Sequence, residues 1–343
     1  MSPTATRAGR PPRRAAPVPV PEPVVMAPSP PPSAPFDRWA PAHYEPARVP
    51  REVRRYAAVP DTLAVGQPGK VGLLELSFEQ RGGRTELTGH FQKSPLQVMR
   101  PLYYDPARPD LPITQVMSTG GGILQGDRLR IDLRCGPGTS LHLTTQTATR
   151  VHRMEFDYAT QQVTVEAGPD SYVEYLPDPT IPYAGSRLYQ RTVVTAAPTA
   201  TVLAAETLYA GRLARGEHYA YDVLASDFEL RRPDGGLVAL DTMRLVPRPA
   251  GVTGPAVLAG HDIVSTLYAV TPLAPAAAVA DILHRALADS GALFGVSVLP
   301  HDCGAWVRLL SSDPRTASAA LRAAWDAVRR LLIGVPAPVL RKS

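Results

Sequence analysis

The stretch Leu133-Arg-Cys-Gly-Pro137-Gly-Thr-Ser-Leu141 decides the fold, because its arrangement returns twice further along the chain. Apolar residues lie four positions before and four positions after Pro137, Pro169 and Pro198, and the three prolines are 32 and 29 residues apart. These apolar positions are Leu133, Leu141, Val165, Val173, Val194 and Val202. Such a repeat predicts chain segments that stack as similar β-layers, since one segment cannot bury its apolar face alone. A β-sandwich of regular hairpins is the alternative.

Apolar and polar residues alternate with a period of two through most of the region between residues 70 and 270. Residues 71–78 and 85–91 predict a β-hairpin closed by a Gly82-Gly83 turn. Residues 129–133 alternate in the same way, and turn residues arrive about every ten positions. The pattern therefore predicts a body of many short strands.

Near the C-terminus the period changes to that of a helix. Residues 276–287 carry apolar side chains at helical spacing. A second helix should begin with Asp313 as its N-cap and Pro314 in its first turn, and it should end at Gly334. Two strands are expected between the helices, at residues 295–299 and 305–310. The predicted fold is mainly β, a β-helix-like stack of many short strands with two C-terminal α-helices.

Charge and proline divide the 343 residues into two regions. The chain has 36 Lys and Arg against 31 Asp and Glu, and residues 1–55 contain nine Arg but only four acids, which accounts for the net charge of +5. Fifteen of the 38 prolines lie in residues 1–50. We therefore expect residues 1–55 to be a disordered Pro/Arg-rich tail and residues 56–343 to be a single β-rich domain.

The neutral body lacks the basic surface that a nucleic-acid-binding module needs. No segment is apolar enough for a signal peptide or a membrane span, so a cytoplasmic location is expected.

The richest glycine cluster, Ser118-Thr-Gly-Gly-Gly-Ile-Leu-Gln-Gly-Asp127, is not a phosphate-binding loop. It has no Gly-Lys-Ser/Thr ending, and it leads into a predicted strand rather than a helix. Its glycines suit a tight reversal with positive φ, in which Asp127 could be only a turn residue. The hydroxyl-rich run Thr144-Thr-Gln-Thr-Ala-Thr-Arg150 is open to a similar structural interpretation, as a polar strand face.

Other candidate motifs also fall short of an active site. The segment Tyr175-Leu-Pro-Asp-Pro-Thr-Ile-Pro-Tyr183 contains three prolines that fix the chain path. His301-Asp-Cys303 offers two soft ligands, too few for a closed metal site, and the other cysteine is far away in the sequence. The sequence contains no Gly-x-Ser-x-Gly nucleophile motif. These observations favour a binding function over catalysis.

Several blocks, in order, resemble the UreD (UreH) family of urease accessory proteins. The blocks are Gly120-Gly-Gly-Ile-Leu-Gln-Gly-Asp127, Leu143-Thr-Thr-Gln-Thr-Ala-Thr-Arg-Val-His-Arg153, Glu174-Tyr-Leu-Pro-Asp-Pro-Thr-Ile-Pro-Tyr183, and Glu206-Thr-Leu-Tyr-Ala-Gly-Arg212 with the following Gly216-Glu217. The resemblance runs from about residue 69 to residue 338 and leaves out the tail.

This resemblance implies a urease maturation factor without catalytic activity of its own. It implies a UreF-type helical partner and a UreG-type GTPase, with GTP bound only by the latter. It also implies docking on apo-urease while Ni²⁺ enters, with Ni²⁺ held transiently along an internal channel and no tightly bound cofactor. Oxygen ligands would hold Ni²⁺ weakly enough for passage, whereas imidazole and thiolate clusters would trap it.

Matching the family blocks residue by residue implies Asp127, Asp241 and Glu206 as acids of the transient nickel path. We expect Asp127 and Asp241 to face a polar interior path near Thr149 and Arg150. Structural or channel-lining roles are implied for Gly121, Gly122, Gly126, Thr149, Arg150 and Pro177. A β-helix carbohydrate-active enzyme is the alternative function, and an interaction module without a metal role is a third.

Overall fold

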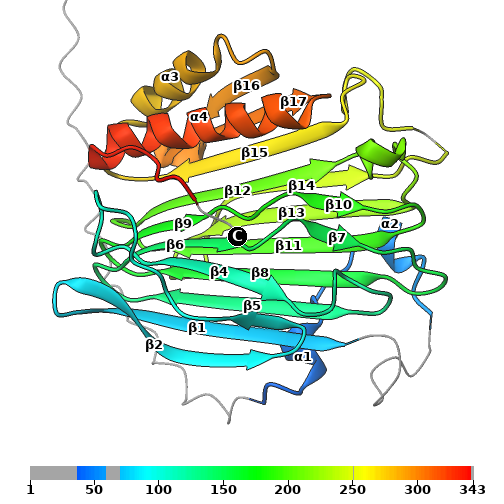
Figure 1. The fold of residues 1–343 in the computed structure, drawn as a ribbon, viewed down its shortest axis with the longest axis horizontal. Coiled ribbons are helices and arrows are strands. Elements are labelled where there is room, and N and C mark those ends of the chain that lie inside the picture. Colours follow the sequence, from blue (N-terminus) through cyan, green and yellow to red (C-terminus); the bar gives the residue numbers. More distant parts are fainter. Residues whose placement is uncertain (1–36, 59–69, 250, 341–343) are drawn as a thin grey trace, which may run out of the picture. The chain divides into compact units, whose positions relative to one another are not determined.

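The computed structural model describes residues 37–58, 70–249 and 251–340, and its compact unit begins at Arg38. Two sheets face each other within this unit (Figure 1). Sheet A contains, in spatial order, β14 (Leu237–Leu245), β13 (Val223–Arg231), β11 (Arg187–Ala196), β8 (Ala159–Ala167), β5 (Arg128–Cys135), β1 (Val71–Arg81) and β2 (Arg84–Lys93).

Sheet B forms the second layer. Its spatial order is β16 (Leu293–Val298), β17 (Gly304–Ser311), β15 (Ile263–Val270), β12 (Thr201–Tyr209), β9 (Tyr172–Tyr175), β6 (Ser140–Thr145), β4 (Ile113–Ser118) and β3 (Leu96–Val98). The short strands β7 (Thr149–Val151) and β10 (Thr180–Pro182) pair with each other, and β10 also pairs with β12.

Each proline turn of the sequence repeat carries the chain from sheet A to sheet B. Strands β5, β8 and β11 are parallel neighbours in sheet A, and β6, β9 and β12 are parallel neighbours in sheet B. Parallel pairing requires a crossover, so regular hairpins are excluded here. The stacked, β-helix-like layers are therefore confirmed.

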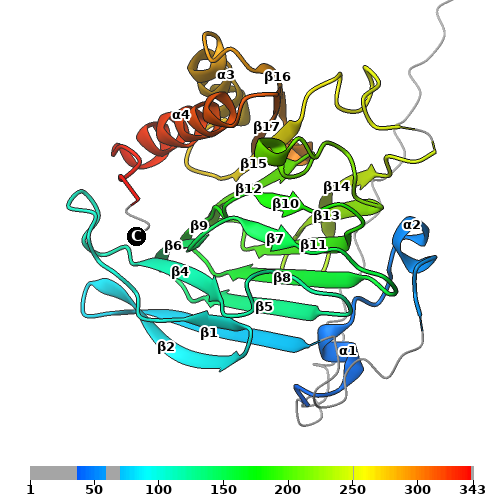
Figure 2. The same cartoon turned by 45° about the vertical axis from the view of Figure 1, so that its right-hand side comes forward.

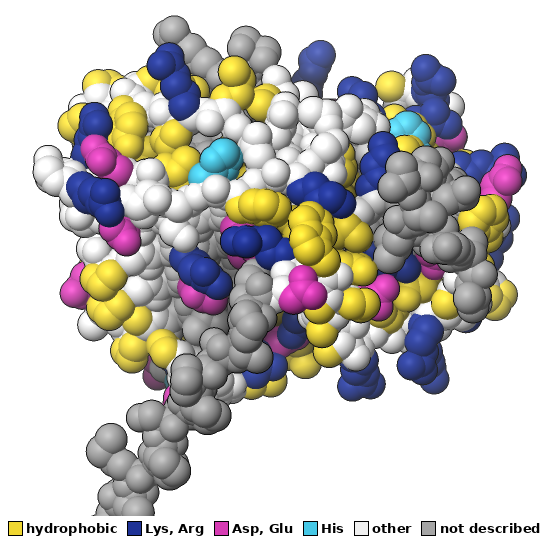
Figure 3. All heavy atoms as spheres, turned by 90° about the horizontal axis from the view of Figure 1, so that it is seen from below, with side chains coloured by type: hydrophobic (Ala, Val, Ile, Leu, Met, Phe, Trp, Pro, Cys, Tyr) yellow, Lys and Arg dark blue, Asp and Glu magenta, His cyan; other side chains and the backbone are white. Residues whose placement is uncertain are grey.

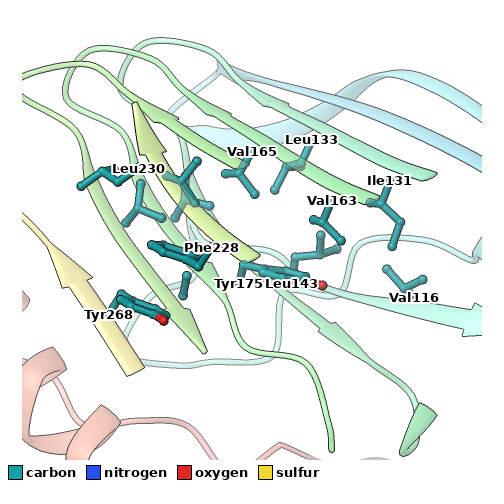
Figure 4. Close-up of a cluster of buried hydrophobic side chains, with 14 of the residues drawn as sticks. Val116, Ile131, Leu133, Leu143, Val163, Val165, Tyr175, Phe228, Leu230 and Tyr268 are labelled. Carbon is teal, nitrogen blue, oxygen red and sulfur yellow. The ribbon is translucent and has the colours of Figure 1, made fainter. Parts of the chain in front are cut away.

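The repeat positions form ladders of stacked side chains across the layers. In sheet A, Val165 pairs with Leu133 on one side and with Val194 on the other. Val173 pairs in the same way with Leu141 and Val202 in sheet B. All six side chains are buried in the hydrophobic cluster between the sheets, part of which Figure 4 shows. Because each side chain of a ladder is buried only when the neighbouring layer is in place, the layers depend on one another for stability.

The hairpin and both helices occur where the sequence predicts them. Arg81 pairs with Arg84 around Gly82 and Gly83, both at positive φ. The first helix, α3, spans Ala276–Leu287. The second, α4, spans Pro314–Ile333, with the Asp313 carboxylate accepting from the Thr316 backbone N–H and with Gly334 left-handed at the C-cap.

A second hydrophobic cluster holds the two helices on sheet B. It combines Val279 and Leu283 of α3 and Val328 of α4 with Leu267 of β15 and Val307 of β17. The helices accordingly lie beside β15, β16 and β17 in Figures 1 and 2. No helix in the described ranges is long and apolar enough to cross a membrane.

The predicted boundary of the tail at residue 55 is wrong, because the segment of residues 38–55 packs on sheet A. It forms α1 (Pro41–Tyr44) and α2 (Arg51–Arg54). The Val53 side chain is fully buried beside Tyr189, and the Gln162 side chain donates to the Tyr44 carbonyl over 3.0 Å. The predicted boundary depends on the average composition of the whole proline-rich region, in which these few core residues have little weight. Residues 1–36 lie outside the described residues.

Charged side chains on the face seen from below are mixed in sign. Figure 3 shows Lys and Arg scattered among acidic and apolar groups rather than gathered in one continuous patch.

Candidate functional site

A polar cluster lies between the apolar inner faces of the two sheets, and we call it the Glu206–Asp241 cluster. Glu206 belongs to β12, where its inward-facing neighbours Ala204 and Leu208 are apolar core residues. Because side chains alternate along a strand, the same period that buries these neighbours turns Glu206 inward. Asp241 of β14 reaches toward β15 and β17 from the opposite sheet.

Glu206 is held by neutral donors from sheet A. Its Oε1 atom accepts hydrogen bonds from Gln190 Nε2 over 2.9 Å and from Ser226 Oγ over 2.5 Å. The pKa of Glu206 is raised to about 7, mainly by burial and to a smaller extent by the negative charge of Asp241, although the Ser226 hydrogen bond acts in the opposite direction. At neutral pH this carboxyl group therefore exchanges a proton easily, and a cation could take the proton's place.

Asp241 has charged as well as neutral partners. Its Oδ2 atom accepts from the hydroxyl of Tyr268 and from the guanidinium of Arg308. The Arg308 Nε atom also donates to Thr266 Oγ1 over 3.2 Å. The cluster thus presents two carboxylates, with one arginine and several neutral oxygens, in a partly buried space.

Asp127 does not belong to this cluster. Three strands of sheet A, β13, β11 and β8, lie between β14, which carries Asp241, and β5, which follows Asp127. The Asp127 carboxylate accepts one backbone N–H on each oxygen, from Lys70 over 3.0 Å and from Leu124 over 2.8 Å. Burial raises the pKa of Asp127 although these two N–H groups favour its ionised form. Together with Gly126 at a φ of 75°, Asp127 fixes the end of the glycine-rich loop.

The glycine-rich loop and the threonine-rich run meet at a cavity of about 140 Å³. Gly121, Gly122, Thr149 and Arg150 are among its lining residues. The Ile123 N–H donates to the Arg150 carbonyl over 2.7 Å, so the two segments are joined along their backbones. Gly122 is required there, because a Cβ atom at its position would lie 2.5 Å from the Arg150 carbonyl oxygen.

Apolar side chains occupy the region between this cavity and the Glu206–Asp241 cluster. Figure 4 shows Val163, Tyr175 and Phe228 among the side chains that pack there. The structure therefore does not bring all the predicted path residues together. It places Glu206 and Asp241 close enough for their charges to interact, and it groups Thr149 and Arg150 with the glycine-rich loop near Asp127.

Pro177 lies in a different place, in the link between β9 and β10. It lines a cavity of about 210 Å³ together with Tyr209 of β12 and Trp325 of α4. The next residue, Asp178, donates its backbone N–H to Thr145 Oγ1 over 2.9 Å. Pro177 thus shapes the chain beside α4 rather than the space between the sheets.

Sequence reasoning missed a buried charged network under α4. Glu174 accepts a hydrogen bond from Trp325 Nε1 over 3.1 Å and lies 2.7 Å from His142 Nδ1. Arg329 is fully buried and donates to Asp105 over 2.7 Å. Burial alone would raise the pKa of Glu174, but the His142 hydrogen bond and the Arg329 charge lower it. The sequence does contain one signal for this network: Arg329 follows Trp325 by one helical turn, so it lies on the apolar stripe of α4, where a charged side chain needs a buried partner.

Comparisons with known sequences identify the family of this chain. Residues 70–343 match the family model described as UreD urease accessory protein. A urease accessory protein UreD 2 from Streptomyces griseus subsp. griseus is 61% identical over 288 residues, which cover 83% of this chain and 98% of the relative. A protein of the same name from Methylorubrum extorquens is 38% identical over 81% of this chain and 91% of the relative. Another from Brucella suis biovar 1 is 36% identical over 84% of this chain and 96% of the relative. The predicted resemblance is confirmed, and the chain belongs to the UreD urease accessory protein family.

Proposed function

We propose that this protein is a maturation factor of urease that has no catalytic activity of its own. In this proposal it acts in the cytoplasm with UreF-type and UreG-type partners, binds apo-urease and assists GTP-dependent nickel insertion. GTP binds only to the partner GTPase, and Ni²⁺ is cargo that the chain holds transiently. The names of the curated relatives and the family match support the role in urease maturation.

The Glu206–Asp241 cluster is the observation that carries the nickel role. Two carboxylates 35 positions apart in the sequence are placed together between sheets that are otherwise largely apolar there. Burying two like charges costs free energy, so a purely structural core would not favour them. Carboxylate and hydroxyl oxygens bind Ni²⁺ less tightly than imidazole and thiolate groups do, which suits transfer rather than storage.

The surrounding side chains have distinct proposed roles. Arg308 and the Tyr268 hydroxyl orient Asp241, and Arg308 balances its charge when no cation is present. Glu206 gives up its proton as Ni²⁺ arrives and takes a proton again as Ni²⁺ leaves. Asp127 acts indirectly in this scheme, by fixing the loop that borders the cavity at Thr149 and Arg150.

Reconstitution with and without the chain tests the proposed function. Apo-urease is incubated with UreF- and UreG-type proteins, GTP, bicarbonate and Ni²⁺, and both urease activity and nickel content are measured. We expect the nickel content and the activity to depend on the chain, and we expect the chain to copurify with the two partners. Equal activation without the chain would refute the role.

A further inference from the structure

The segment of residues 38–55 brings a histidine to two acids of sheet A. His43 lies in α1, Glu75 in β1 and Asp132 in β5. The Nε2 atom of His43 is 3.7 Å from Glu75 Oε1 and 3.8 Å from Asp132 Oδ2. One ligand atom from each residue lies within 4.8 Å of the other two. A cation between them could therefore reach all three with small side-chain movements.

Burial and the types of ligand atom suit these groups to bind a metal. His43 and Asp132 are each 8% exposed, and Asp132 Oδ1 is buried without a hydrogen-bond partner among the described residues. An imidazole nitrogen and carboxylate oxygens are ligand atoms that a transition-metal cation accepts. Within the described ranges, no other group of three His, Cys, Asp or Glu side chains converges in this way.

We propose that His43, Glu75 and Asp132 form a binding site for a divalent transition-metal cation such as Ni²⁺ or Zn²⁺. One imidazole and two carboxylates are a donor set that these cations accept, with further positions open to water or an incoming ligand. His43 precedes residues 70–343, the part that matches the family model, so the site depends on a segment outside that match. The inference goes beyond the proposed function and does not depend on it.

Two arginines set the strength of this site. Arg38 Nε donates to Glu75 Oε2 over 2.8 Å, and Arg130 Nε donates to Asp132 Oδ2 over 2.7 Å. These contacts hold the carboxylates in place, but the two positive charges oppose an arriving cation. The site is therefore weak and exchangeable. The Arg38 side chain is 41% exposed, so it can turn into solvent when a cation approaches.

Because the charges of the two arginines oppose a bound cation, substitutions can distinguish a metal site from a network of ion pairs. Removing the charge of Arg38 should strengthen metal binding, whereas removing the imidazole of His43 should weaken it. In a network that binds no metal, neither substitution would change the affinity of the chain for Ni²⁺.

The test measures Ni²⁺ binding to the full chain by competition with a chromophoric chelator. The variants are His43→Ala, Asp132→Asn and Arg38→Gln, and His301→Ala, which removes an exposed histidine elsewhere, is the matched control. We expect one Ni²⁺ per chain and a loss of affinity of about tenfold or more in His43→Ala and Asp132→Asn. Arg38→Gln should gain about tenfold, because one opposing positive charge is removed, and the control should not change. Cobalt substitution should give a visible d–d spectrum that His43→Ala abolishes.

Near-UV circular dichroism shows whether each variant keeps its fold, and Arg38→Gln provides a second readout if His43→Ala releases the N-terminal segment. Equal Ni²⁺ affinity in the wild type and His43→Ala would overturn the proposal. It would also be overturned if Arg38→Gln failed to tighten binding. Neither result bears on urease activation, so failure of this site and failure of the proposed function can be told apart.

Discussion

Replacing Glu206 by Gln should stabilise the protein at neutral pH while removing a carboxylate that we propose binds Ni²⁺. Gln keeps the size of the side chain and an oxygen that can accept from Gln190 and Ser226, but it carries no charge. The substitution therefore isolates the cost of keeping a carboxyl group in this partly buried place.

The pKa of Glu206 gives both the magnitude and the sign of the expected change in the free energy of unfolding. Burial raises this pKa from 4.5 to about 7, so the folded protein retains the proton over a pH range in which the unfolded chain has lost it. Wild-type stability consequently falls as the pH rises through this range, and the loss is complete above the folded pKa. A shift of this size corresponds to about 3 kcal/mol in the free energy of unfolding. The Gln variant lacks this loss.

Urea unfolding at several pH values measures the difference directly. We expect the free energies of unfolding of wild type and Glu206→Gln to be similar near pH 4.5, and the variant to be more stable by up to about 3 kcal/mol at pH 8. Glu166→Gln, which alters an exposed glutamate of β8, should show no such trend. A stability difference that does not change with pH, or a variant that is less stable at pH 8, would show that burial does not govern the protonation of Glu206.

Three further substitutions test the elements that hold the fold, each by urea unfolding. Asp313→Ala removes the N-cap bond to the Thr316 N–H and should cost about 1 kcal/mol. Val165→Ala opens a cavity in the middle of the sheet A ladder and should cost about 2 kcal/mol or more; a loss below 0.5 kcal/mol would count against the ladder as a core element. Gly122→Ala places a Cβ atom 2.5 Å from the Arg150 carbonyl oxygen and should cost about 3 kcal/mol, more than Gly121→Ala, whose Cβ would meet nothing within 4 Å.

The fold could be predicted where local residues determine it. Alternation identifies the strands, Asp313 and Gly334 set the ends of α4, and the recurrence of Pro137, Pro169 and Pro198 reveals the stacking. These signals depend on neighbours within a few residues or on a regular repeat, both of which can be read along the chain.

The candidate site depends instead on the order of strands in space. Nothing in the spacing of Glu206 and Asp241 shows that β12 and β14 approach each other from opposite sheets, and only the family resemblance selected both. The same resemblance also selected Asp127, which the strand order places on a different part of sheet A. The role of the segment that carries His43 was missed, because proline content outweighed its few buried residues.

Under the proposed function, Glu206 lowers stability at neutral pH but is needed for nickel transfer, as expected for a residue that is kept for its chemistry rather than for packing. A gain in stability in Glu206→Gln combined with a loss of nickel delivery would show this trade-off in a single substitution.

Nickel content per urease active site, after reconstitution with wild type, Glu206→Gln or Glu166→Gln, tests the central claim most directly. The three chains should bind the partner proteins equally, which copurification verifies. The account predicts that wild type and Glu166→Gln deliver equal amounts of nickel and that Glu206→Gln delivers at most about one tenth as much. Even the loss of a side chain that only supports a metal ligand typically weakens a metal site about tenfold or more, and Glu206 is proposed as a ligand itself. Full nickel delivery by Glu206→Gln would contradict the claim that the Glu206–Asp241 cluster handles Ni²⁺.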